Sequence, residues 1–182
     1  MKIVFLDRAT LGQGISLSAI ERLGDYYEYE STSPEQIIDR IKDASIVIVN
    51  KVVIGKEQMD SAPLLRLICV AATGMNNIDL KYASERDIAV RNAVNYSSES
   101  VAQTTFSALL ALIGHISYFD KCVKSGKYSL SPHFTDTGRS YFELSGKRFG
   151  VIGMGNIGKR VAAIASAFGS EVVYSSTSGA AH

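Results

Sequence analysis

One glycine-rich segment constrains the fold of this 182-residue chain more than any other feature. Residues 153–158 read GMGNIG, so the segment fits the pattern GxGxxG. A β-rich apolar run at 148–152 precedes it, a helical pattern follows at 156–168, and another β-rich run follows at 171–175. Glycine is a common residue, but this pattern between a strand and a helix is typical of a βαβ unit in a parallel sheet. The sequence therefore predicts a strand, a glycine turn, a helix and a second strand.

In such a unit each glycine has its own physical task. Gly153 permits the tight turn, Gly155 lets the backbone approach a pyrophosphate, and Gly158 lets the helix pack closely on the sheet. The start of the helix, at Asn156 and Ile157, presents free N–H groups and a positive dipole end to the phosphates. The alternative is a strand–turn–helix that uses its glycines for packing alone. The strand before the turn and the second strand after the helix together favour dinucleotide binding.

The end of the second strand decides how the ribose of a dinucleotide is held. An acidic residue usually stands there and accepts hydrogen bonds from the ribose hydroxyls. Here residues 172–178 read VVYSSTS and contain no carboxylate. We align Ser176 with that position, where its hydroxyl can bind the ribose but carries no charge. We therefore expect NAD as the cofactor and leave NADP open.

The first half of the chain has the pattern of a separate α/β unit. Short apolar runs of strand length stand at 3–6, 46–49 and 67–71. A surface helix is expected at 55–61, and another opens at Ser33, with Pro34 at its first position and Gln36 able to complete a capping box. Nearly continuous apolar strands alternating with helices indicate a parallel sheet covered on both faces. Residues 1–98 are expected to form this unit, and residues 99–182 the second one.

A long helix is expected at 99–125, because apolar residues recur there at steps of three and four. Its neighbouring flank is apolar too, so the helix should be enclosed, for instance between two domains. Residues 126–146 are polar, with glycines and a proline, and read as an irregular surface connection.

Composition excludes several classes of function. The chain is 46% hydrophobic and 20% charged with a net charge of +1, which gives no electrostatic reason to expect nucleic acid or a membrane as partner. Its most apolar segment, 106–119, falls short of the ~20 residues of a membrane span. The two cysteines, Cys69 and Cys122, lie in apolar stretches and read as buried thiols of a reduced, cytoplasmic protein. We assign no metal site.

Three further segments resemble those of the D-isomer-specific 2-hydroxyacid dehydrogenases. Residues 71–79 (AATGMNNID) are similar to the family's glycine loop, residues 93–103 (AVNYSSESVAQ) to its entry into the interdomain helix, and residues 143–147 (ELSGK) to its lead into the GxGxxG. Residues 50–53 (NKVV), taken with the 71–79 loop, look most like the glycerate dehydrogenase or hydroxypyruvate reductase branch. The resemblance implies a flavodoxin-like substrate domain followed by the first βαβ of a Rossmann dinucleotide-binding domain, and a homodimer.

The resemblance also implies roles for particular residues. In the family the substrate carboxylate lies against backbone amides of the glycine loop, which match Thr73 and Gly74 here. The alternative is a plain strand-to-helix turn with Asp79 as N-cap, and both can hold. Tyr96 matches a place for a substrate-facing hydroxyl, although it can equally be packing. Thr104 matches a position that meets the cofactor phosphates. Lys51 can offer a positive charge to an anionic substrate, but it reads more readily as a surface lysine.

The family's catalytic groups are missing from this stretch of sequence. The resemblance implies a substrate-binding arginine and a histidine–carboxylate pair, all beyond the second Rossmann strand. His115, His133 and His182 do not fit these roles and are read as structural or exposed. We therefore expect a C-terminally truncated, inactive part of an NAD(P)-dependent oxidoreductase acting on a small 2-keto or 2-hydroxy acid. The alternatives are a dinucleotide-responsive regulator on the same scaffold and, less compatible with residues 71–103, a methyltransferase-like nucleotide-binding module.

Overall fold

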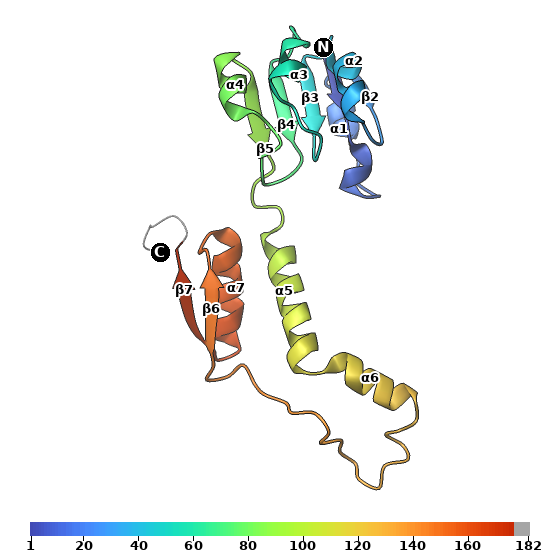
Figure 1. Cartoon of the computed structure of the whole chain (residues 1–182), viewed down its shortest axis with the longest axis vertical. Coiled ribbons are helices and arrows are strands. Elements are labelled where there is room, and N and C mark those ends of the chain that lie inside the picture. Colours follow the sequence, from blue (N-terminus) through green and yellow to red (C-terminus); the bar gives the residue numbers. More distant parts are fainter. Residues whose placement is uncertain (177–182) are drawn as a thin grey trace. The chain divides into compact units, whose positions relative to one another are not determined.

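The computed structural model describes residues 1–176, which divide into two compact units (Figure 1). The first unit is Met1–Val94, and the second begins at Asn95. The boundary lies in the turn that leads into the first long helix.

The first unit is built on a five-stranded parallel sheet. Its strands are β1 (Lys2–Phe5), β2 (Asp25–Glu28), β3 (Ile46–Val49), β4 (Leu67–Val70) and β5 (Ala89–Asn92). They lie in the order β2-β1-β3-β4-β5, and every neighbouring pair is parallel. This is the flavodoxin-like strand order, so the predicted fold class is confirmed. The topological switch point, where the direction of winding reverses, lies between β1 and β3.

Two of these strands do not follow from the hydrophobic pattern. The runs predicted at 3–6, 46–49 and 67–71 are β1, β3 and β4, each within one residue. The strands β2 and β5 were not predicted, because they read DYYE and AVRN. Both are edge strands with exposed residues, and such strands do not need the continuous apolar run of a central strand.

The helices of the first unit are short. They are η1 (Arg8–Leu11), α1 (Ser18–Glu21), η2 (Pro34–Gln36), α2 (Ile37–Ile41), α3 (Lys56–Asp60) and α4 (Leu80–Glu85). The predicted capping at Ser33 is present, because its N–H donates to Oε1 of Gln36 at 3.1 Å. The predicted N-cap Asp79 accepts from the Tyr82 N–H at 2.9 Å.

The two faces of the sheet are not covered equally. Alternate residues of β1 point to opposite faces, as the period of a strand requires. Val4 and Leu6 belong to the large core under α2, α3 and α4, whereas Ile3 and Phe5 lie in a smaller cluster with Leu17 and Ile20. Within the first unit, η1 and the four-residue α1 lie over the second face, and an apolar groove stays open along β3, β4 and β5, so the predicted cover of both faces is incomplete there.

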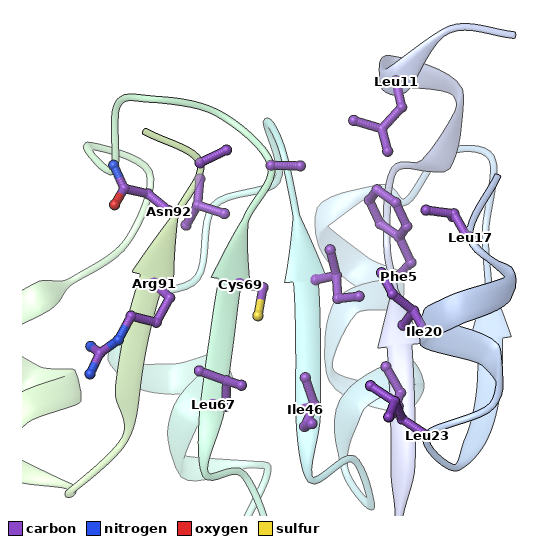
Figure 2. Close-up of a pocket in the computed structure, with 15 residues that line it drawn as sticks. Phe5, Leu11, Leu17, Ile20, Leu23, Ile46, Leu67, Cys69, Arg91 and Asn92 are labelled. Atoms are coloured by element: carbon purple, nitrogen blue, oxygen red, sulfur yellow. The ribbon is translucent and has the colours of Figure 1, made fainter. Parts of the chain in front are cut away.

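An apolar groove of about 370 Å³ marks this thinly covered face. Figure 2 shows Phe5, Ile46, Leu67 and Cys69 along its floor, with Ile20 facing them from α1. Cys69 is only half-buried, Cys122 is buried, and both thiols are free, so the prediction of two buried thiols holds for Cys122 alone. Burial raises the pKa of the Cys69 thiol.

The second unit contains α5 (Ser98–Ile113), α6 (Ile116–Lys124), β6 (Arg148–Ile152), α7 (Asn156–Ala167) and β7 (Glu171–Ser175). The strands β6 and β7 form a parallel pair and have the predicted bounds. Phe106 of α5 stacks between Phe149 and Phe168, with ring centroids 5.8 and 5.6 Å apart. Residues 126–146 contain no helix or strand, as predicted.

The long helix predicted at 99–125 is broken. It ends at Gly114, His115 takes the left-handed conformation with φ 50°, and α6 leaves at an angle of 59° to α5. A Cβ at Gly114 would lie 2.8 Å from the carbonyl oxygen of Leu110, so glycine is required at this corner. Within the second unit by itself, Leu112 and Val123 are 72% and 60% exposed.

The spacing of the apolar residues did not reveal this break, because Gly114 and His115 do not fall at the apolar positions of the predicted helix. No single helix among residues 1–176 is long and apolar enough to cross a membrane. The pair α5 and α6 passes that test only when the two are joined across their bend.

Candidate cofactor and substrate sites

The glycine turn of the second unit has a geometry that only glycine allows at two positions. Gly153 follows β6 with φ 88°, in the left-handed region. A Cβ on Gly158 would lie 2.0 Å from the carbonyl oxygen of Gly153, so the helix packs directly on the turn. A Cβ on Gly155 would meet nothing within 4 Å. The space over Gly155 is therefore open, and the protein's own packing does not demand a glycine there.

The helix α7 begins at this open space. Gly155 is its N-cap, and the Lys159 N–H donates to the Gly155 carbonyl at 2.8 Å. The N–H groups before Lys159 are those that a helix leaves without an internal acceptor. The side chain of Asn156 donates to Oδ1 of Asn95. This arrangement suits an anion at the helix start.

The helix α7 buries Gly158, Val161 and Ala165, whereas Ile157 in its first turn is 38% exposed and Phe168 is 41% exposed. Phe168 is still used in packing, through its stacking on Phe106.

Ser176 stands directly after β7 and beside the glycine turn. The carbonyl of the preceding Ser175 accepts from the Gly153 N–H at 2.8 Å, which ties the end of β7 to the turn. Ser176 is half-buried. Thr177 and Ser178, the last two residues of the 172–178 stretch, lie outside the described residues, as does His182.

Thr104 lies on the exposed side of α5, while Ala102 and Phe106 on either side of it are buried. The start of α5 is joined to α7 by an ion pair between Glu99 and Arg160, with Oε2 and Nε 2.8 Å apart. Tyr96 is 66% exposed and belongs to the segment before α5. Within residues 1–176, neither the Thr104 side chain nor the Tyr96 side chain forms a hydrogen bond or an ion pair that would hold it in a site.

The carboxyl edge of the sheet in the first unit carries the other candidate residues. Thr73 and Gly74 follow β4 and are both exposed. Asn92, at the end of β5, donates through Nδ2 to the Thr73 carbonyl at 2.6 Å. A Cβ on Gly74 would come within 3.1 Å of Oδ1 of Asn76, which is tight but not forbidden. The loop is thus both an ordinary turn into α4 and an exposed pair of backbone amides.

Sequence reasoning missed one buried acidic residue at this edge. Asp7 follows β1, is 4% exposed, and accepts backbone N–H bonds from three successive residues after β3. The middle one of these residues is Lys51, whose side chain is exposed. The sequence contains one signal for this position of Asp7. The aspartate comes directly after an apolar strand, and a residue in that place must lie at the carboxyl edge of the parallel sheet.

The two histidines among residues 1–176 are His115 and His133. Nε2 of His115 lies 2.9 Å from the Ser140 carbonyl oxygen, so this histidine anchors the connection after α6. His133 is exposed within that connection. Within residues 1–176 no group of three or more histidine, cysteine or acidic side chains is placed to hold a metal ion.

A parallel sheet of flavodoxin-like order followed by a glycine turn at a helix start defines a class of two-unit dehydrogenase-like proteins. Comparison with known families specifies it further. The profile described as "D-isomer specific 2-hydroxyacid dehydrogenase, catalytic domain" matches residues 6–181. The chain belongs to the D-isomer-specific 2-hydroxyacid dehydrogenase family.

Curated relatives agree with this assignment. A putative 2-hydroxyacid dehydrogenase of Haemophilus influenzae is 37% identical over 174 residues, which are 96% of this chain and 55% of that protein. The hydroxypyruvate reductase of Blautia hydrogenotrophica is 36% identical over 95% of this chain and 55% of its own length. The glycerate dehydrogenase of Methylorubrum extorquens is 34% identical over 94% of this chain and 54% of its own length. The chain thus spans about half the length of the relatives it matches.

Solved structures show the same fold. An acyclic imino acid reductase in complex with NADPH and D-Arg has a TM-score of 0.86 and 27% identity, and the match covers 100% of this chain and 58% of that one. The D-lactate dehydrogenase of Aquifex aeolicus, complexed with NAD and lactic acid, has a TM-score of 0.73 and 27% identity, covering 94% of this chain and 50% of that one.

Proposed function

We propose that the protein containing this chain transfers a hydride between NADH or NADPH and a small 2-keto acid, with hydroxypyruvate and D-glycerate as the favoured pair. The observation that carries the proposal is the glycine turn, where open space over Gly155 meets the start of α7 in a chain of this family. The relatives named hydroxypyruvate reductase and glycerate dehydrogenase support the choice of substrate.

The residues of this chain would divide the work of binding between the two units. In the second unit, Gly153, Gly155, Asn156, Ile157 and Gly158 would hold the pyrophosphate, with Thr104 on α5 contributing to the phosphates and Ser176 to the ribose. In the first unit, the amides of Thr73 and Gly74 would bind the substrate carboxylate, with Tyr96 as a further substrate contact. The nicotinamide supplies the hydride when it is bound. Proton transfer requires a group that these residues do not provide.

The direct test compares the 182-residue chain with the full-length protein. NADH and NADPH oxidation is measured with hydroxypyruvate, pyruvate and glyoxylate. We expect turnover only from the full-length protein, because no histidine–carboxylate pair or substrate arginine is assigned within residues 1–182. Turnover by the short chain would contradict our placement of the active site. Reading the gene past codon 182 for an arginine, a glutamate and a histidine separates an enzyme from a dinucleotide-responsive regulator.

A second candidate is the reduction of an imino acid. The structure with a TM-score of 0.86 to this chain is an imino acid reductase bound to NADPH and D-Arg. Both reactions would use the same carboxylate-binding and cofactor-binding elements. Adding ammonia or an amine to each keto acid assay distinguishes them, since only imine reduction yields an amino acid product.

The cofactor preference is proposed to rest on Ser176. An aspartate there would accept hydrogen bonds from the ribose and would repel a 2′-phosphate. A serine can bind the ribose but carries no charge that would repel the phosphate. A hydrogen bond to a charged partner contributes about 1.5–3 kcal/mol, which corresponds to about ten- to a hundredfold in preference. Residues 174–182 contain no arginine or lysine, so we expect use of both cofactors or a modest preference for NADH.

The test compares kcat/KM for NADH and NADPH in the full-length protein and its Ser176→Asp variant. The substitution should move the ratio towards NADH by about tenfold or more. Ser166→Asp, on the exposed side of α7, adds the same charge away from the strand end and should leave the ratio unchanged. Strong rejection of NADPH by the wild type, with no effect of Ser176→Asp, would show that Ser176 does not face the ribose.

A further inference from the structure

The buried carboxylate of Asp7 is unusual in having backbone amides, and no side-chain cation, as its partners. It accepts from the N–H of Asn50 at 2.8 and 3.1 Å, of Lys51 at 2.5 Å and of Val52 at 3.0 Å. No ion pair involves Asp7 within residues 1–176, although its side chain is 4% exposed. A buried charge is tolerated only when it is well hydrogen-bonded, and three successive amides form a cradle for an anion.

The loop that Asp7 holds is the connection immediately after β3. Asp7 itself follows β1, and β1 and β3 are the neighbours between which the winding of the sheet reverses. Ligands of open α/β sheets bind outside the carboxyl ends of the strands at such a point. The bonds from Asp7 therefore fix backbone at the place where this fold presents its binding loops.

The same loop is held from its other side by Asn77. Its Nδ2 donates to the Val52 carbonyl at 2.9 Å, and its own carbonyl accepts from the Ile54 N–H at 2.9 Å. Asn77 stands in the 71–79 loop, which also carries Thr73 and Gly74. The contacts thus run from Asp7 through residues 50–52 to the loop with the proposed carboxylate-binding amides.

The side chain of Lys51 is left exposed by this arrangement. Lys51 and Val52 line an open cleft of about 420 Å³ together with Asp7, Thr10 and Glu30. Lys51 forms no ion pair with any residue of the described part of the chain. Its backbone is fixed by Asp7 while its ammonium group is available to an anionic ligand.

We infer that Asp7 is a positioning residue, which holds the 50–52 loop and its Lys51 beside the substrate-binding loop. The inference rests on the proposed function, since the substrate is the 2-keto acid of that reaction. Asp7 would act through the three backbone amides from which its carboxylate accepts, so its loss should weaken keto acid binding without changing the dinucleotide turn of the second unit.

The first test is a kinetic comparison of the full-length protein with its Asp7→Asn variant. The carboxamide keeps the size of the side chain, but it places an NH2 group against amide donors. We expect the KM for hydroxypyruvate to rise about tenfold, since small displacements of binding groups have effects of this size, while the KM for NADH stays within about twofold. Asp43→Asn is the control, because Asp43 is an exposed carboxylate paired with Lys2 in the same unit. It should leave both KM values unchanged.

The outcomes separate this inference from the proposed function. A wild-type protein that reduces no 2-keto or 2-imino acid would contradict the proposed function. An active wild type, with an unchanged hydroxypyruvate KM in a folded Asp7→Asn variant, would overturn the role of Asp7 alone. If Asp7→Asn fails to fold, Asn77→Ala loosens the loop from its other side and should raise the same KM. An unchanged value there would also refute the inference.

Amide hydrogen exchange tests the same contacts in the 182-residue chain without any substrate. The amides of Asn50, Lys51 and Val52 should exchange slowly, and that of Val53 quickly, because the Val53 N–H donates no hydrogen bond within residues 1–176. Asp7→Asn should remove the protection and Asp43→Asn should retain it. Exchange of Lys51 as fast as Val53 in the wild type would show that Asp7 does not hold the loop.

Discussion

The two units of this chain use the same strand–helix–strand logic but bury very different amounts of apolar surface. In the described residues, the main core of the first unit contains sixteen buried residues under a five-stranded sheet, and the core of the second contains six beside a two-stranded sheet. A two-stranded sheet is marginally stable alone. A recognisable motif therefore does not guarantee a stable core, because stability depends on the number of strands that share each face.

The difference is visible in single side chains of the strands. Val47 and Ile68, on the central strands β3 and β4, are fully buried. Ile152 at the end of β6 is 86% exposed, and Val173 on β7 is 43% exposed. Strands of a parallel sheet are normally covered on both faces. In the described part of the second unit, the pair packs against α7 and α5.

The largest expected effect is a core truncation in the first unit. Ile68→Ala should lower the free energy of unfolding by about 2–5 kcal/mol, because the side chain is fully buried and the cavity cannot collapse completely. Residue-resolved hydrogen exchange should show the loss in the amides of β1, β3 and β4. The amides of α7 should keep their protection. Equal loss in both units would mean that they unfold as one and that their stabilities do not differ.

A smaller effect is expected for a glycine substitution in the second unit. Gly158→Ala should cost about 1–3 kcal/mol, because its Cβ would meet the Gly153 carbonyl oxygen at 2.0 Å. Gly155→Ala is the matched control, since a Cβ there meets nothing within 4 Å. Thermal unfolding followed at α7 should fall for the first variant only. The reverse order would contradict the packing described for this turn.

The exposed apolar surface of the second unit leads to a prediction of self-association. We expect the 182-residue chain to dimerise or aggregate, because the pair of strands leaves an uncovered edge and face. Light scattering at micromolar concentration tests this, and a monodisperse monomer would count against it. Ile152→Thr should reduce association more than Leu130→Ser. Both side chains are 86% exposed, but only the first belongs to a strand.

The smallest expected effect is a local pH dependence in the 126–146 connection. The N–H of Gly138 and the hydroxyl of Tyr118 donate to Asp136, at 2.8 and 3.0 Å, and hold the pKa of its carboxyl below the usual value. A lowered pKa contributes stability above the ordinary range near ~3.9, and this is lost as the pH falls through the folded value. The Gly138 amide shift should therefore titrate below pH ~4, and Asp136→Asn should abolish that titration.

Much of the second unit was predictable because its elements are local. The glycine pattern marks the end of β6 and the start of α7, and an apolar strand must follow at once, so β6 and β7 were placed to the residue. The edge strands β2 and β5 were not predictable in this way. Their sequences are polar enough for loops, and only pairing with β1 and β4 makes them strands.

The same distinction applies to the candidate site. Thr73, Gly74 and the glycine turn were located from sequence, because each stands in a short motif at the end of a strand. The binding roles of these residues stay predictions. Asp7 was missed because its partners are the amides of residues 50–52, more than forty positions away in the chain.

The α/β class, the central strands and the glycine turn could be read from the sequence alone, since they depend on periodicity and on the conformations open to glycine. The break at Gly114 and His115, the open groove on one sheet face and the burial of the Asp7 carboxylate became visible only in the folded chain. Local patterns report which backbone conformations are favourable. Whether a side chain is buried, and which distant group satisfies its hydrogen bonds, depends on residues that folding alone brings together.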